Sequence, residues 1–155
     1  MVRHMKGVLI LETYNEQWKT FHTTSSLTHS RLYQVSNTGK VRSRNNTMPE
    51  HYGCWKYHTL VNGGYNSQYI KVSCGRGIGY QYVHKLVLEA FISPRPSGLQ
   101  ANHKDLDTEN NKVENLEWIT PSENASHMQR AYGGVNQFTN HRTKEQAREF
   151  LRSQV

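Results

Sequence analysis

The 155-residue chain contains only two cysteines, Cys54 and Cys74, and no apolar run long enough to cross a membrane. Two thiols cannot build a disulfide framework or a four-cysteine zinc site. A membrane span needs about 18 apolar residues, whereas the longest apolar runs are at 7–11 and 86–88. The N-terminus also lacks the apolar stretch of a secretory signal. These absences predict a cytoplasmic protein without a membrane partner.

Apolar residues are scarce as well. They make up 35% of the chain, below the roughly 45–50% of an ordinary globular domain. Aromatic residues nevertheless reach 10%, and disordered chains are poor in aromatics. We therefore expect a folded chain with a small core.

Acidic side chains are few in the first two thirds of the sequence. Residues 1–100 hold 12 Lys and Arg against 4 Asp and Glu, whereas residues 101–155 hold 7 against 8. The net charge is +7 and the isoelectric point is about 9.5. A basic front segment predicts a polyanionic partner such as nucleic acid, because neutralised phosphates release counterions. The alternative is that the surplus charge serves solubility only.

The front segment shows the pattern of short antiparallel strands. Residues 31–35 alternate between polar and apolar, residues 36–39 form a turn with Gly39, and residues 40–44 alternate again. A second hairpin is predicted from 57–61 and 68–72, and the glycine-rich stretch 75–79 is interpreted as a hairpin tip. It lacks the strand–loop–helix context of a phosphate-binding loop.

Cations follow one face of the first predicted hairpin. Such a hairpin can lie along the phosphates of DNA or enter one of its grooves, and further basic residues extend this row of cations. The alternative is an ordinary solvated strand face. The candidate DNA-binding residues are Lys40, Arg42, Arg44, Lys56, Arg76, His84 and Lys85.

The later part of the chain changes character. A helix is predicted over 84–92, followed by a linker at 93–98, a strand at 99–103, a polar loop at 104–115 and a strand at 116–120. Thr120, Pro121 and Glu123 then form a strong helix start, and this helix should run to about residue 131. A final helix should begin at Thr143 and reach the end.

Polar side chains gather on this strand–loop–strand–helix unit. Asn102 and His103 end the first strand, Asn115 closes the loop, and Asn124 and His127 share one helix face. Mg²⁺ takes oxygen ligands and keeps several waters, and a single imidazole suits a general base. From spacing alone, a structural histidine and an asparagine-rich turn remain alternatives.

Several motifs in this unit together resemble a known family. They are His84-Lys85-Leu86-Val87, Asn102-His103-Lys104-Asp105, Asn110-Asn111, Glu114-Asn115-Leu116-Glu117-Trp118, Glu123-Asn124 and His127. This series resembles the HNH homing endonucleases of phages and mobile introns, which are ββα-metal nucleases. Residues 16–18 and 33–43 resemble the small DNA-binding module that often precedes that nuclease.

The resemblance implies roles for individual residues. His103 corresponds to the general base that activates water, and Asn124 corresponds to the helix-borne metal ligand. Asn115 corresponds to the asparagine that braces the loop and helps to hold His103. Asn102 falls where relatives place a metal ligand, often Asp, and His127 either contacts the scissile phosphate or packs. One divalent ion is implied, Mg²⁺ with Mn²⁺ as a substitute.

Two further positions are left open by the resemblance. His84 is expected to be structural or to contact the DNA backbone. Asp105 and Asp107 either contribute to the ion or belong to a solvated loop.

The sequence thus predicts an α+β protein. A β-rich DNA-binding module at 1–79 would precede an HNH unit at 80–133 and a helical tail at 134–155. The expected function is metal-dependent cleavage of one or both strands of double-stranded DNA, by a monomer or homodimer encoded by a phage or intron and acting in the cytoplasm of a bacterial host. The alternatives are a DNA-binding protein with an inactive HNH unit, which the neutral Asn102 favours, and an RNA-binding protein.

Overall fold

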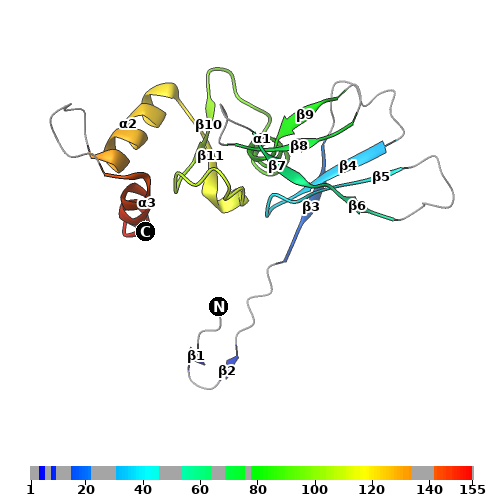
Figure 1. Cartoon of the computed structure of the whole chain (residues 1–155), viewed down its shortest axis with the longest axis horizontal. Helices are drawn as coiled ribbons and strands as arrows, with labels where there is room; N and C mark the ends of the chain where they lie inside the picture. Colours follow the sequence, from blue (N-terminus) through cyan, green and yellow to red (C-terminus); the bar gives the residue numbers. More distant parts are fainter. Residues whose placement is uncertain are drawn as a thin grey trace.

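The computed structural model describes residues 4–5, 8–9, 15–21, 31–45, 54–63, 69–75, 78–133 and 142–154. It combines helices with antiparallel strand pairs (Figure 1), so the predicted α+β class is confirmed. The elements up to residue 91 are β1 His4–Met5, β2 Val8–Leu9, β3 Trp18–Thr20, β4 Arg31–Ser36, β5 Val41–Asn45, β6 Lys56–Tyr57, β7 Leu60–Asn62, β8 Ile70–Ser73, β9 Tyr80–Tyr82 and α1 Val83–Phe91.

The first predicted hairpin is confirmed as β4 and β5, which pair from Arg31↔Asn45 to Val35↔Val41. Gly39 in its turn adopts φ +87°, a conformation that glycine tolerates best. Val41 and Ser43 are buried, whereas Arg42 and Arg44 are half-buried on the other face. Strands β3 and β6 extend the hairpin to the four-stranded order β3-β4-β5-β6.

The second predicted hairpin is confirmed as β7 and β8, with Leu60 opposite Val72. A third strand, β9, pairs with β8 and was not predicted. Its three residues are too short for a clear alternating pattern. The glycine-rich stretch joins β8 to β9, and Cys74 N donates to Gly79 O, which confirms the hairpin-tip interpretation for its described residues.

Helix α1 lies at the centre of the core (Figure 1). Its Leu86, Val87 and Leu88 are buried together with residues of β4, β5, β8 and β11, namely Val35, Val41, Val72 and Leu116. The predicted helix is confirmed; Leu88 is fully buried, while Ala90 and Phe91 are half-buried and pack against the core. A single core therefore crosses the predicted boundary at residue 80, and that boundary stays a prediction.

The later elements match their predicted positions closely. They are β10 Gln100–His103, the short 3-10 helix η3 Val113–Asn115, β11 Leu116–Ile119, α2 Pro121–Tyr132 and α3 Lys144–Arg152. Thr120 and Glu123 form the expected capping box, and Gly133 ends α2 in the left-handed conformation. Thr143 and Gln146 cap α3 in the same way. A small second cluster of Leu106, Ala131 and Ala147 holds α2 and α3 together.

None of the helices in the described ranges is both long and apolar enough to span a bilayer.

Candidate active site

The site is built on the β10–β11 hairpin, whose two faces serve different purposes. Gln100 pairs with Ile119 and His103 with Leu116, so Ala101 and His103 point to one face and Gln100 and Asn102 to the other. The Ala101 face packs on the core beneath α1. The Asn102 face turns toward α2, because Asn124 Nδ2 donates to Gln100 Oε1 at 3.1 Å.

His103 is held in a buried ring of aromatic and polar side chains. Only 4% of it is exposed, and its ring centroid lies 5.2 Å from that of His84 and 5.9 Å from that of Tyr69. Its Nε2 lies 3.2 Å from Asn111 Oδ1. Burial lowers the pKa of His103, although the Asn111 bond and the charges of Asp105 and Asp107 oppose that shift. A neutral imidazole is the form that can accept a proton.

Asn115 ties the polar loop together. Its Nδ2 donates to Asp105 Oδ1 at 2.9 Å and to Asn110 O at 2.8 Å, and its Oδ1 accepts from Asp105 N at 3.1 Å. It reaches His103 only through the backbone, where Lys104 N donates to Asn115 O. The side chain that hydrogen-bonds His103 is Asn111, which belongs to the Asn110-Asn111 motif but was given no role from the sequence. Its position next to Asn110 in a polar loop gave no signal that separates the two asparagines.

The two candidate metal-ligating amides each donate to a nearby acceptor. Asn102 Nδ2 donates to Glu117 Oε1 at 2.8 Å across the hairpin, and Asn124 Nδ2 donates to Gln100 Oε1. Their amide oxygens receive no hydrogen bond from the described residues. Glu117 is a second residue that the sequence analysis missed, although it directly faces Asn102 in the strand register.

The remaining acidic candidates are engaged elsewhere. Asp105 accepts from Asn110, Asn115 and the backbone of Asp107, and Asp107 forms an ion pair with Arg148 of α3 at 2.8 Å. No group of three or more His, Cys, Asp or Glu side chains within the described ranges could hold a metal ion. Any ion at this site would therefore depend mainly on amide oxygens.

His127 is anchored to the strand beside it. Its Nε2 lies 3.1 Å from the carbonyl oxygen of Lys104, and a carbonyl only accepts, so Nε2 carries the proton. The Nδ1 atom is buried and has no hydrogen-bond partner among the described residues. The structure thus brings His127 to the same end of β10 as His103.

The cations of the first hairpin are held by neighbouring side chains. Arg42 lies between two indole rings, 3.9 Å from the Trp18 centroid and 4.2 Å from the Trp55 centroid, and donates twice to Gln34 Oε1. Arg44 lies 5.1 Å from the Trp55 centroid. Stacking of this kind fixes a guanidinium in place.

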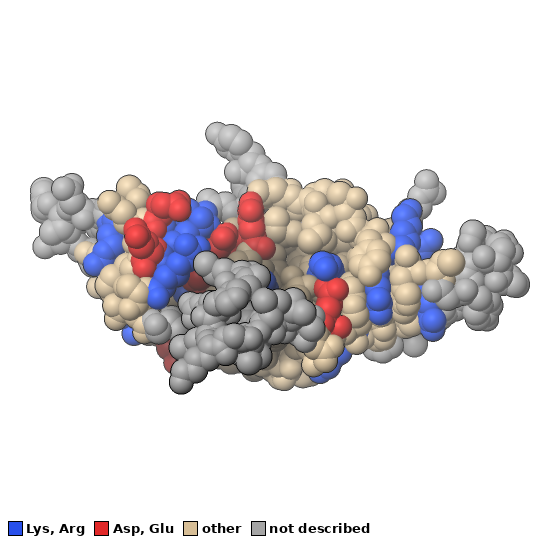
Figure 2. All heavy atoms as spheres, turned by 90° about the horizontal axis from the view of Figure 1, so that it is seen from below, with Lys and Arg blue, Asp and Glu red and all other residues tan. Residues whose placement is uncertain are grey.

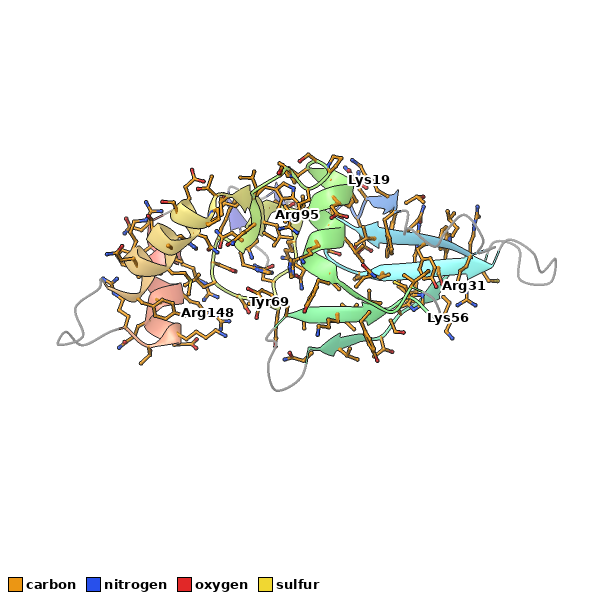
Figure 3. All side chains as sticks on the ribbon, turned by 90° about the horizontal axis from the view of Figure 1, so that it is seen from above. Lys19, Arg31, Lys56, Tyr69, Arg95 and Arg148 are labelled. Atoms are coloured by element: carbon orange, nitrogen blue, oxygen red, sulfur yellow. The ribbon has the colours of Figure 1, made fainter. Side chains whose placement is uncertain are left out.

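The other candidate DNA-binding residues are spread over the molecule. Lys40 forms an ion pair with Glu16 at 3.2 Å, Lys56 is exposed on β6, and Arg76 lies outside the described residues. Figure 3 shows Arg31 and Lys56 at the β4–β6 end, and Figure 2 shows Lys and Arg but no acidic side chains among the described residues on the visible face of that end.

His84 and Lys85 meet the β10–β11 hairpin at a pocket. It has a volume of about 290 Å³ and is lined by residues that include Tyr82, His84, Lys85, Arg95, Trp118 and Asn124. Figure 3 shows Tyr69 and Arg95, two of its lining residues, at the junction between the front strands and the hairpin. His84 itself is 4% exposed, and its buried Nδ1 has no hydrogen-bond partner within the described ranges.

The burial of His84 predicts acid sensitivity. Desolvation, with the charges of His103 and Lys85, lowers its pKa from 6.5 to about 3. Between these values the unfolded chain binds a proton that the folded chain does not, so stability falls as the pH falls through this window. We expect the loss of unfolding free energy between pH 7.5 and pH 5 to be smaller in His84→Phe than in the unaltered chain, as measured by urea titration. An equal loss in both would contradict this reading. His103 and His58, whose pKa values are also lowered by burial, should retain part of the effect.

Comparison with known proteins defines the class. Residues 81–126 match the family model described as HNH endonuclease, and this stretch contains His103, Asn102, Asn115 and Asn124. The chain therefore carries an HNH endonuclease domain, and the predicted resemblance is confirmed.

Individual relatives agree with this assignment. The DNA endonuclease I-HmuI of Bacillus phage SP01 is 35% identical over 96 residues, covering 62% of this chain and 51% of that protein. The SPbeta prophage-derived protein YosQ of Bacillus subtilis (strain 168) is 44% identical over 52 residues, covering 34% of this chain and 30% of YosQ. The uncharacterized HNH endonuclease L247 of Acanthamoeba polyphaga mimivirus is 36% identical over 100 residues, covering 61% of this chain and 22% of L247.

A solved structure shows the same fold. A structure that describes DNA binding and cleavage by the HNH homing endonuclease I-HmuI can be superposed on this chain with a TM-score of 0.53 and 28% sequence identity. The superposition covers 77% of this chain and 61% of the I-HmuI chain. The chain thus spans about half of the length of I-HmuI in sequence.

Proposed function

We propose that this chain is a metal-dependent HNH endonuclease that hydrolyses phosphodiester bonds of double-stranded DNA. The observation that carries the proposal is the HNH domain at 81–126, in which His103, Asn102 and Asn124 occupy one hairpin and the helix packed on it. The similar phage enzyme I-HmuI is described as a DNA endonuclease. The chain spans only about half of the length of I-HmuI, so we propose, by similarity, that the whole protein has this activity.

His103 is the general base in this mechanism. Its ring is neutral near pH 7, because burial lowers its pKa, so it can take a proton from the attacking water. Asn115 keeps the loop after β10 in shape through its three side-chain hydrogen bonds. His127 donates through Nε2 to the Lys104 carbonyl, which supports the packing role, and a contact with the scissile phosphate would require this hydrogen bond to open.

The residues fit one hard divalent cation, Mg²⁺ with Mn²⁺ as a substitute. The amide oxygens of Asn102 and Asn124 accept no hydrogen bond from described residues, and oxygen donors of this type suit these ions. When bound, the ion stabilises the negative charge that develops on the phosphate. Glu117 adds a carboxylate beside Asn102, which supplies negative charge that two amides lack.

The basic residues of the front strands are the proposed DNA contact. They are Lys40, Arg42, Arg44, Lys56 and Arg76, with His84 and Lys85 at the pocket beside the β10–β11 hairpin. Lys56 pairs with Ser43 and therefore lies on the opposite face of the sheet from Arg42 and Arg44. Support comes from the stacked geometry of Arg42 and Arg44 and the excess of cations in residues 1–100. One such site per chain cuts one strand, so cutting both requires a homodimer or a second encounter. We further propose a phage- or intron-encoded enzyme that acts in the bacterial cytoplasm.

The first experiment is a nicking assay on supercoiled plasmid and on DNA that flanks the gene, with Mg²⁺, Mn²⁺ or EDTA. We expect cleavage with either ion and none with EDTA, and the ratio of open-circle to linear product reports cleavage of one strand or two. Binding without cleavage on every substrate would instead favour a DNA-binding protein with an inactive HNH unit, for which the neutral Asn102 is the supporting observation.

Asn102→Asp should create a repulsive pair with Glu117. The amide donor that reaches Glu117 Oε1 at 2.8 Å would become a carboxylate, and losing such a bond typically costs about 1–3 kcal/mol. We expect lower unfolding free energy in EDTA, measured by urea titration at pH 7.5, and a larger recovery on adding Mn²⁺ than in the unaltered chain.

The matched control is the double variant Asn102→Asp with Glu117→Gln, in which the new amide can donate to the new carboxylate. It should regain the stability that the single variant loses in EDTA. If the single variant is as stable as the unaltered chain in EDTA, the contact between these two side chains does not hold in solution.

A further inference from the structure

The hydrogen bonds around Asn111 fix which way its amide points. Its Nδ2 donates to the carbonyl oxygen of Glu109 at 3.1 Å, which leaves Oδ1 facing His103 Nε2 at 3.2 Å. Asn111 and His103 are each only 4% exposed, so water does not readily replace either partner. The carbonyl oxygen of an amide accepts and cannot donate.

An acceptor at Nε2 selects one tautomer of the His103 ring. Nε2 must carry the proton in order to donate to Asn111, and in a neutral imidazole the other nitrogen, Nδ1, then keeps its lone pair. Nδ1 makes no hydrogen bond to the described residues. It is therefore the nitrogen that can take a proton from water.

The position of Asn111 depends in turn on the β4–β5 turn of the front module. A Cβ added to Gly39 would lie 2.8 Å from Asn111 Cβ, closer than real Cβ atoms come to a neighbour, and 3.2 Å from Asn111 O, which is a tight contact. The neighbouring Val113 N donates to Asn37 O at 2.9 Å. The turn and the polar loop are thus in direct contact, and only glycine fits at residue 39.

We propose that Asn111 is a positioning residue that holds His103 in the Nε2-protonated tautomer, and that the absence of a side chain at Gly39 of the front hairpin leaves the room in which Asn111 takes this position. The catalytic consequence rests on the proposed endonuclease function, whereas the tautomer itself does not. This arrangement links the sheet that carries the proposed DNA-binding cations to the nitrogen that receives the proton. Asn111 itself need not touch DNA.

The test is nitrogen-15 NMR of the histidine rings at pH 7.5, which distinguishes the two tautomers, in the full chain and two variants. We expect the Nε2-protonated form for His103 in the unaltered chain, a mixture of tautomers in Asn111→Ala, and the original form in Asn111→Asp, because a carboxylate also accepts from Nε2. An unchanged tautomer in Asn111→Ala, or a Nδ1-protonated ring in the unaltered chain, would overturn the proposal.

Cleavage kinetics give the second readout. Asn111→Ala should lower kcat by about 10–100-fold, the usual cost of losing a hydrogen bond that orients a functional histidine, with unchanged DNA affinity, and Asn111→Asp should restore most of it. If the unaltered chain cleaves no DNA but shows the expected tautomers, the endonuclease proposal fails and the positioning role of Asn111 stands.

A second glycine with positive φ serves as a control that distinguishes the contact between Gly39 and Asn111 from the general cost of backbone strain. Gly39 and Gly79 both adopt positive φ, +87° and +74°, but an added Cβ at Gly79 meets no atom within 4 Å. Both alanine variants should lose stability, while only Gly39→Ala should change the His103 tautomer. Equal tautomers in the two variants would remove Gly39 from the proposal.

Discussion

His103→Ala is expected to lower the rate of DNA cleavage by about 10²–10⁴-fold, the usual contribution of a general base. DNA affinity should stay within about twofold of the unaltered chain, because the removed ring is 4% exposed and contacts Asn111, His84 and Tyr69 rather than the surface. Single-turnover cleavage at saturating enzyme, together with a filter-binding titration in EDTA, separates the two quantities.

A histidine outside the site supplies the control. His58 is half-buried and bonded to Ser43, far along the chain from the hairpin, and His58→Ala should leave the single-turnover rate close to that of the unaltered chain. If His103→Ala cleaves as fast as the unaltered chain, or loses binding and cleavage together, His103 is not the base.

The second large effect is expected for Arg42→Ala combined with Arg44→Ala. Both guanidinium groups are held by indole rings on an accessible sheet face, and each phosphate contact contributes about 0.9 to the slope of log affinity against log salt. Removing two such contacts should weaken binding and reduce the magnitude of the slope by about 2. Titrations between 50 and roughly 200 mM salt measure both changes.

The control for this variant removes the same charge elsewhere. Arg130 and Arg152 are exposed on α2 and α3, and replacing both by alanine alters the net charge equally. That variant should change the slope less. A slope that is unchanged in Arg42→Ala with Arg44→Ala would place the DNA on another face of the molecule.

The elements that the sequence predicted well are those governed by local interactions. The β4–β5 hairpin follows from alternating side chains and from Gly39, which takes the positive φ that its turn requires. Helix α2 begins where Thr120 and Glu123 cap it and ends at Gly133. In each case the deciding contacts lie within a few residues of one another, so the residue order carries the information.

Contacts between distant segments were not predictable from the same patterns. The pair Asn102–Glu117 depends on the register of a hairpin whose strands are separated by a 12-residue loop. The contact between Asn111 and His103 depends on the path of that loop. The contacts of Arg42 with Trp18 and Trp55 depend on how β3, β5 and the residue before β6 come together in the sheet. None of these leaves a periodic signature, because each depends on where the backbone folds back.

The central position of α1 has a consequence for engineering new specificities. Val83, Val87 and Leu88 are fully buried among residues that come from both the front strands and β11. A recombinant junction placed at residue 80 would separate this helix from the buried residues Val35, Val41 and Val72 of the front strands. Chimeric proteins built from this scaffold should therefore exchange the front strands together with α1. The graft should be made in the 93–98 connection, where Pro94, Arg95, Ser97 and Gly98 are exposed.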